Sequence, residues 1–272
     1  MVPLFLLLAA PLAKPRRVPL VLWYQHGMAS QALKHAVRLS DVVITADVRS
    51  FPLRSSKVRG IGHAIDVDRF SPAAARPSED GHLRLLALGR FSWVKGYDTL
   101  LDGFGLAVER GLDAQLELRG PQLTEAERRH HAELAELVRR SPVLSGRVEL
   151  SDAVSRDLVP ELLRNSDGVL SATRARDSET FDKVVLEAGA CGVPVLTDNS
   201  ALAELLGDLP VELRFRSRDP KSLSEKLLAF AAAGPERRAE AGAELRRRVV
   251  AGHSTESWAD AVTKIVGGQT RE

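Results

Sequence analysis

Short apolar runs alternate with amphipathic segments along most of the chain, and the alternation is clearest after residue 82. The apolar runs occupy residues 83–89, 114–120, 147–151, 168–173 and 194–198. Each has the length and composition of a strand that is buried on both faces of a parallel sheet. The segments between the strands are predicted helices, at residues 96–110, 124–140, 157–166 and 182–191. The pattern therefore indicates successive βαβ units, whose sheets bind ligands at the carboxyl ends of their strands.

The first 70 residues show the same alternation on a smaller scale. The predicted order is helix 3–13, strand 19–25, helix 30–40, strand 41–46 and strand 58–65. Residues 71–81 are rich in Pro, Ala and charged side chains, which is typical of a linker. Residues 219–266 are predicted to be helical, and the last of these helices is able to pack back across the first part of the chain.

The composition is that of an ordinary globular protein. Of the 272 residues, 44% are hydrophobic and 27% are charged, which excludes disordered and collagen-like chains. Lys and Arg number 38 against 36 Asp and Glu, and this net charge of +2 gives no support for a nucleic-acid partner. The single cysteine, Cys191, excludes an intramolecular disulfide and a zinc site built from cysteines.

The apolar segment 1–13 resembles neither a membrane span nor a signal peptide. It is too short to cross a bilayer as a helix. Its nearest cations, Lys14, Arg16 and Arg17, follow the apolar residues, whereas those of a signal peptide precede them. We expect a cytoplasmic protein, with a peripheral position at the inner membrane face as an alternative.

Several familiar catalytic motifs are missing. The chain contains no GxGxxG after a strand, no P-loop, no GxSxG and no HExxH. Its Asp-x-Asp sequence, Asp66 to Asp68, lies in a predicted turn, where a solvated turn is favoured over a metal site. His130 and His131 are expected at the surface and Cys191 in the packing of a helix end, so no metal ligands are assigned.

Two cations stand where a phosphate group would bind. Arg90 closes the strand 83–89, and Lys95 opens the following helix. Arginine offers a planar fork of donors and lysine a point charge, and both suit a diphosphate. Taken alone, the two residues fit a pair of exposed basic side chains equally well.

A second set of polar residues follows the strand 168–173. A loop there leads to a helix, with Glu179 before the helix and Glu187 within it. A helix N-terminus presents free N–H groups to an anion, and carboxylates accept hydrogen bonds from sugar hydroxyls. Two surface glutamates on an amphipathic helix are the alternative for this pair.

These residues together resemble the donor-binding half of the retaining glycosyltransferases of family 4. The resemblance rests on the segment 90–96 (RFSWVKG), on the E-x7-E spacing from Glu179 to Glu187, on 187–195 (EAGACGVPV) and on 62–72 (GHAIDVDRFSP). It extends over roughly residues 20–266 and implies an α/β fold of the GT-B type, with two Rossmann-like lobes. The implied domains are an incomplete acceptor-side lobe with its crossover (1–75), a complete donor-binding domain (76–252) and a returning C-terminal helix (253–272).

The resemblance also implies a role for each matching residue. Arg90 and Lys95 would hold the diphosphate of a nucleotide sugar, Glu179 the sugar hydroxyls and Glu187 the ribose, with Arg90, Lys95 and Glu179 as the catalytic group. The other donor contacts would come from Gly120, from Ala153 and Val154 beside the nucleobase, and from Phe181, Asp182 and Lys183. His26 would lie on the acceptor side, and neither a metal nor a cofactor is implied.

The sequence departs from the family pattern in two places. The usual E-G-F-G becomes Glu179-Thr180-Phe181-Asp182, which removes both glycines. The chain also begins at what resembles the fourth or fifth element of the first lobe. We therefore expect a hexosyltransferase acting on an unknown acceptor, with a non-catalytic nucleotide-sugar-binding module or one chain of a split transferase as alternatives. The N-terminal lobe would then associate with a second copy or a second chain.

Overall fold

A computed structural model describes residues 3–73, 82–174 and 182–269. The backbone contacts divide the chain into two units. The first contains the residues up to Asp66, Asp182 and the residues from Val250 onward, and the second contains Val67–Arg174 and Lys183–Val249. Each unit has a parallel sheet of its own, as the alternation of apolar runs and helices predicts.

The second unit is built on a five-stranded parallel sheet. Its strands are β4 (Leu83–Leu88), β5 (Ala114–Arg119), β6 (Val148–Ser151), β7 (Gly168–Ser171) and β8 (Val195–Thr197), in the spatial order β6-β5-β4-β7-β8. The chain runs outward from β4 to β6 and then returns to place β7 on the other side of β4. The strand order therefore reverses between β4 and β7, and this is the position where such sheets bind ligands.

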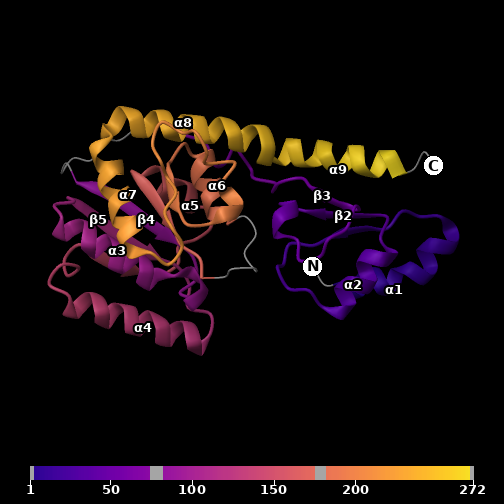
Figure 1. The fold of residues 1–272 in the computed structure, drawn as a ribbon, viewed down its shortest axis with the longest axis horizontal. Coiled ribbons are helices and arrows are strands. Elements are labelled where there is room, and N and C mark those ends of the chain that lie inside the picture. Colours follow the sequence, from indigo (N-terminus) through magenta and orange to yellow (C-terminus); the bar gives the residue numbers. More distant parts are fainter. Residues whose placement is uncertain (1–2, 74–81, 175–181, 270–272) are drawn as a thin grey trace. The chain divides into compact units, whose positions relative to one another are not determined.

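Helices cover both faces of this sheet. Helices α3 (Tyr97–Glu109) and α4 (Glu125–Arg140) lie on one face, and α5 (Val159–Arg164), α6 (Lys183–Ala190) and α8 (Gly234–His253) lie on the other (Figure 1). Helix α7 (Pro220–Ala232) packs along α3. Short 3-10 turns occur at Trp93–Lys95 and Ser200–Leu202. Strands β4, β7 and β8 are largely buried because their residues are apolar on both sides, as at Leu85, Leu86 and Val169, whereas β5 and β6 carry polar residues at alternate positions.

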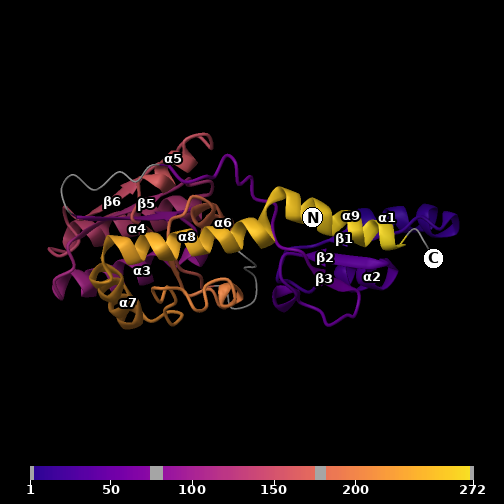
Figure 2. The same ribbon diagram turned by 90° about the horizontal axis from the view of Figure 1, so that it is seen from above.

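The first unit contains a three-stranded parallel sheet in the order β1-β2-β3. The strands are β1 (Val21–Trp23), β2 (Val42–Thr45) and β3 (Val58–Gly60). Helices α1 (Leu4–Ala13) and α2 (Gln31–Leu39) pack against each other, and short 3-10 turns follow at Lys14–Arg16 and Val48–Ser50. Helix α9 (Thr255–Gln269) crosses the sheet near β1, where the rings of Trp23 and Trp258 meet edge to face with centroids 5.4 Å apart (Figure 2).

The predicted strand at 58–65 is shorter than expected. Strand β3 ends at Gly60, and the chain turns at Gly62, whose φ is +72°. A Cβ atom at Gly62 would come within 2.4 Å of the carbonyl oxygen of Gly252, so only glycine fits there. Ile65 then forms an isolated parallel bridge with Ser254 in place of a longer strand.

Helix α1 buries only part of its apolar surface within the described structure. Leu6 and Ala10 face the core of the first unit, whereas Leu4, Phe5, Leu8 and Leu12 are 50 to 67% exposed. None of the helices in the described part of the chain combines the length and the apolar character needed to cross a bilayer.

Candidate functional site

Most of the predicted site residues follow the carboxyl ends of neighbouring parallel strands in the second unit. Arg90 and Lys95 follow β4, Gly120 follows β5, Ala153 and Val154 follow β6, and Asp182, Lys183 and Glu187 come after β7. Because β6, β5, β4 and β7 are adjacent and parallel, their carboxyl ends form one edge of the sheet. Glu179 and Phe181 lie outside the described residues, and His26 and Asp182 belong to the first unit.

Arg90 is oriented by a buried carboxylate. Its Nη1 atom lies 3.1 Å from Oε1 of Glu127, whose side chain is only 6% exposed. Glu127 completes the N-terminal capping box of α4 and also accepts the N–H groups of Leu123 and Thr124. The side chain of Arg90 remains 56% exposed, so it is accessible to a ligand in solvent.

Gly89 and Gly120 bring the ends of β4 and β5 close together. A Cβ atom on Gly120 would lie 1.8 Å from the carbonyl oxygen of Gly89, a distance that no side chain tolerates. The same carbonyl accepts the hydroxyl proton of Tyr97 at 2.8 Å. A Cβ atom on Gly89 would lie 3.3 Å from Cε of Lys95. The glycines therefore set the position of the backbone from which both cations extend.

The residues after β7 are tied to three other elements. The backbone N–H of Thr173 donates to Asp198 at the end of β8 (2.8 Å), and the backbone N–H of Arg174 donates to Val94 in the turn before α3 (2.8 Å). Burial raises the pKa of the Asp198 carboxyl. Arg218 donates from Nη2 to the carbonyl oxygen of Arg174 at 2.7 Å. The ends of β7 and β8 and the turn after β4 are thus connected directly at the switch point.

The remaining predicted donor contacts differ in exposure. Ala153 is exposed and Val154 is half-buried in the loop after β6. Lys183 is exposed at the start of α6, while Asp182 and Glu187 are half-buried. Among the described residues, no three His, Cys, Asp or Glu side chains are grouped so as to hold a metal ion.

The first unit places polar side chains at the corresponding edge of its own sheet. His26 follows β1, is exposed, and meets the ring of Tyr24 edge to face at 5.6 Å. The Nδ1 atom of His253 accepts the backbone N–H of His63 at 3.3 Å. Burial lowers the pKa of His253 to about 4, although the nearby charge of Asp47 acts in the opposite direction.

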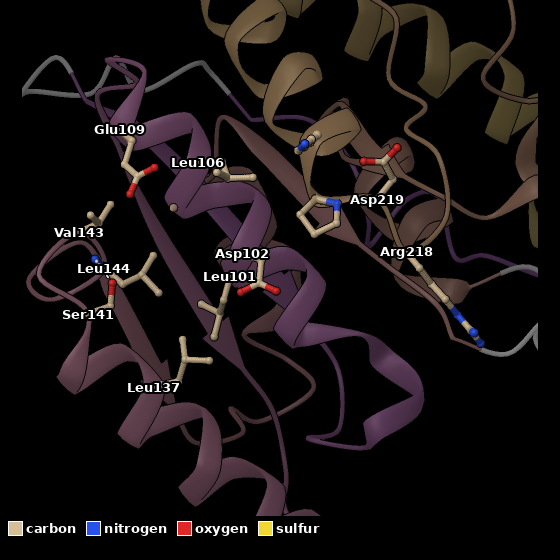
Figure 3. A pocket seen from close by; sticks show the side chains of 13 residues that line it. Leu101, Asp102, Leu106, Glu109, Leu137, Ser141, Val143, Leu144, Arg218 and Asp219 are labelled. Carbon is tan, nitrogen blue, oxygen red and sulfur yellow. Dashed lines mark hydrogen bonds between the residues drawn. The ribbon is translucent and has the colours of Figure 1, made fainter.

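A hollow of about 810 Å³ lies on the α3 side of the second unit (Figure 3). Its labelled walls come from α3, α4, the turn after α4 and the segment before α7. It is lined by Leu101, Asp102, Gly105, Leu106, Glu109, Leu137, Ser141, Val143, Leu144, Arg218, Asp219, Pro220 and Lys221. Of the predicted site residues that the structure describes, none lines this hollow, which is therefore distinct from the strand ends that carry the cations.

Sequence reasoning missed the residues that hold the predicted ones in place. Glu127 was detectable, because Thr124 and Glu127 have the spacing of a capping box. Its pairing with Arg90 depends on the tertiary fold and left no local signal. The expectation that His130 and His131 lie at the surface is wrong. Both are half-buried, and His131 packs edge to face on buried Phe91, with ring centroids 4.5 Å apart, because α4 covers the segment after β4.

The fold is shared with solved glycosyltransferases. HepE from Anabaena, solved with UDP, superposes with a TM-score of 0.80 at 18% identity, covering 97% of this chain and 76% of that one. Sucrose-phosphate synthase from Thermosynechococcus elongatus gives a TM-score of 0.74 at 20% identity, covering 95% and 70%. The two parallel sheets and these neighbours define an α/β protein of the GT-B glycosyltransferase type, as the sequence resemblance implies.

The sequence match identifies the family. Residues 82–233, more than half of the chain, match the family described as glycosyl transferases group 1. The chain belongs to this family. Mannosylfructose-phosphate synthase of Agrobacterium fabrum is 30% identical over 158 residues, which are 55% of this chain and 34% of that protein. The GDP-mannose-dependent monoacylated alpha-(1-6)-phosphatidylinositol monomannoside mannosyltransferase of Corynebacterium glutamicum is 29% identical over 220 residues, or 76% and 55%. The matched regions thus span about a third and about half of these relatives.

Proposed function

We propose that this chain binds a nucleoside diphosphate sugar and transfers the hexose to an acceptor hydroxyl with retention of configuration. The supporting observation is the arrangement of Arg90 and Lys95 after β4, at the point where the strand order reverses, in a chain of the glycosyl transferases group 1 family. Fixed cations at this edge suit a diphosphate leaving group, whose charge grows as the sugar departs.

The proposed reaction needs no protein nucleophile. The bond from the anomeric carbon to the phosphate oxygen breaks, and a bond from that carbon to the acceptor oxygen forms on the same face of the sugar. The acceptor proton passes to the departing phosphate oxygen. Arg90 and Lys95 stabilise the negative charge on the diphosphate, so the proposed reaction is independent of divalent metal.

The other predicted residues have distinct proposed roles. Glu187 binds the ribose hydroxyls and Glu179 the hydroxyls of the transferred sugar. Gly120 permits the close approach of β4 and β5, and Ala153 with Val154 borders the nucleobase. Phe181, Asp182 and Lys183 face the donor from the start of α6, and His26 contributes to the acceptor side.

A mannosyl donor is the first to test, because both curated relatives carry mannose in their names. A thermal-shift screen of GDP-mannose, UDP-glucose and the corresponding free diphosphates would identify the donor, and hydrolysis of the sugar nucleotide would report turnover. Lys95→Ala should abolish most of the stabilisation, whereas Arg139→Ala, which removes an exposed pair with Glu136 in α4, should preserve it. A chelator should change neither binding nor turnover. The absence of stabilisation by every nucleotide tested would refute the proposal, and binding without turnover would favour a non-catalytic module or a chain that needs a second polypeptide.

A further inference from the structure

The switch point contains a second arginine whose surroundings differ from those of an exposed cation. Arg174 follows β7, and its side chain is 18% exposed. Its guanidinium carbon lies 4.6 Å from the ring centroid of Trp93, and its Nη2 atom pairs with Asp98 in the first turn of α3. Arg174 therefore contacts one residue that precedes Lys95 in the sequence, Trp93, and one that follows it, Asp98.

The backbone of Arg174 also makes hydrogen bonds with other parts of the second unit. Its N–H donates to the carbonyl oxygen of Val94 at 2.8 Å, within the same 3-10 turn that contains Lys95. Its own carbonyl accepts Nη2 of Arg218 at 2.7 Å. Arg174, just after strand β7, therefore contacts the short segment 93–98 through both its side chain and its backbone.

The segment 93–98 is anchored at Tyr97, which is buried and donates its hydroxyl proton to Gly89, whereas Trp93 at its start is 56% exposed. The turn Trp93–Lys95 has a single residue in the left-handed region at its end, Gly96, with φ of +56°. No side chain caps the N-terminus of α3. A Cβ atom on Gly96 would lie 3.2 Å from Cβ of Ala172 and 3.7 Å from Cγ of Arg174, so the turn rests directly on the residues after β7. Contacts with Arg174 therefore add a restraint at Trp93, Val94 and Asp98 to the backbone hydrogen bonds of the turn itself.

We propose that Arg174 is a positioning residue that holds the Trp93–Asp98 segment, and hence Lys95, in the orientation that binds the donor diphosphate. This inference rests on the proposed function, because it gives Lys95 the role of a phosphate ligand. Arg174 acts through Lys95 and makes no contact with the diphosphate. Arginine suits this position better than lysine, because a planar guanidinium can stack on an indole and pair with a carboxylate at the same time.

A double-mutant cycle tests the coupling between the two cations. Calorimetry would measure binding of the best nucleoside diphosphate to the wild type, Arg174→Ala, Lys95→Ala and the double variant. Arg174→Ala should weaken binding about tenfold, within the range of coupled contacts, and should have almost no further effect once Lys95 is alanine. Arg174→Lys should recover only part of the affinity, because it keeps the pair with Asp98 and loses the stacking. Arg139→Ala serves as the control for removal of a surface arginine.

The outcomes separate the two proposals. Additive losses in the cycle would show that Arg174 acts independently of Lys95 and would overturn the positioning role while leaving the donor site intact. Full affinity in Arg174→Ala, with a loss in Lys95→Ala, would likewise refute the positioning role alone.

Hydrogen exchange provides a test that needs no nucleotide. The amides of 93–98 should exchange faster in Arg174→Ala than in the wild type, while those of β4 and β5 keep their protection. Unchanged exchange at 93–98 would overturn the inference whether or not a donor is found. If exchange is faster but the chain binds no nucleotide, Arg174 stabilises the turn, and its proposed role in donor binding is refuted.

Discussion

Replacing Gly120 by alanine tests whether the site depends on the close approach of β4 and β5. The new methyl carbon would lie 1.8 Å from the carbonyl oxygen of Gly89, and real Cβ contacts below 3.0 Å are essentially absent. The peptide before Arg90 must therefore move by about 1.2 Å, the difference between these two distances. The obstacle is backbone on both sides, so no side-chain rotation relieves it.

The expected cost follows from the contacts at this point. The N–H of Gly89 donates to Arg119 at 3.0 Å, and the N–H of Gly120 donates to Ser151 at 3.2 Å. Losing two such hydrogen bonds costs about 1–3 kcal/mol, and crowding adds about 1–3 kcal/mol. We expect Gly120→Ala to lower the free energy of unfolding by about 2–6 kcal/mol, the sum of these two contributions.

Urea unfolding followed by circular dichroism measures this change. The matched control is Gly105→Ala in α3, where the new Cβ would lie 3.4 Å from Cδ2 of Leu144, an ordinary contact. That control should gain about 0.5–1 kcal/mol from reduced chain entropy and better helix propensity. Because Arg90 follows the displaced peptide, Gly120→Ala should also weaken nucleotide binding under conditions where the protein remains folded. An unfolding free energy within about 0.5 kcal/mol of the wild type would refute the reasoning, since surface substitutions lie in that range.

Three further predictions concern packing and titration. Gly103→Ala should destabilise the second unit by about 1–2 kcal/mol in urea unfolding, because its Cβ would lie 2.7 Å from Leu223. This is the opposite of the gain expected for Gly105→Ala, two residues further along the same helix. The free energy of unfolding should fall by up to about 3 kcal/mol as the pH drops from 6.5 towards 4. The reason is that His253 takes up a proton in the unfolded chain, whereas the folded side chain, with its pKa of about 4, does not. In His253→Asn, the midpoint of urea unfolding should therefore depend less on pH than in the wild type. Burial raises the pKa of Cys191 to about 11, so a thiol reagent should label it only after unfolding, and rapid labelling of the native chain at pH 7.5 would contradict this.

The alternation of apolar runs predicted the parallel strands of the second unit to within a few residues, because the buried strands β7 and β8 are mostly apolar and β5 still has apolar residues at alternate positions. The same argument predicted a strand at 58–65, whereas β3 ends at Gly60. Residues 61–65 are apolar enough for a strand, but Gly62 turns the chain and Ile65 pairs with Ser254, nearly 190 residues later in the sequence. A bridge between residues so far apart in the sequence produces no periodic pattern of apolar residues within either segment, so the sequence does not predict it.

Candidate site residues were accessible to sequence reasoning where their position follows from topology. Arg90 and Lys95 come directly after a recognisable strand, so their place at the carboxyl edge required only the βαβ pattern. The contacts that orient them come from elsewhere in the chain. Glu127 reaches Arg90 from α4, and Arg174 reaches the turn of Lys95 from the end of β7.

These two supports have different physical characters, and the difference bears on how the site would respond to a ligand. Glu127 is buried and fixed by the backbone at the start of α4, so Arg90 is held by a charge that cannot move without disturbing a helix cap. Arg174 instead stacks on Trp93, which is 56% exposed, and pairs with a partly exposed Asp98. The pair of Arg174 with Asp98 is partly buried, and together with the stacking on Trp93 it restrains the turn of Lys95 through side chains rather than through a helix cap. Arg90 should therefore keep its position through the core of the fold when a diphosphate binds, whereas the turn of Lys95 depends on Arg174 for the orientation that binds the diphosphate.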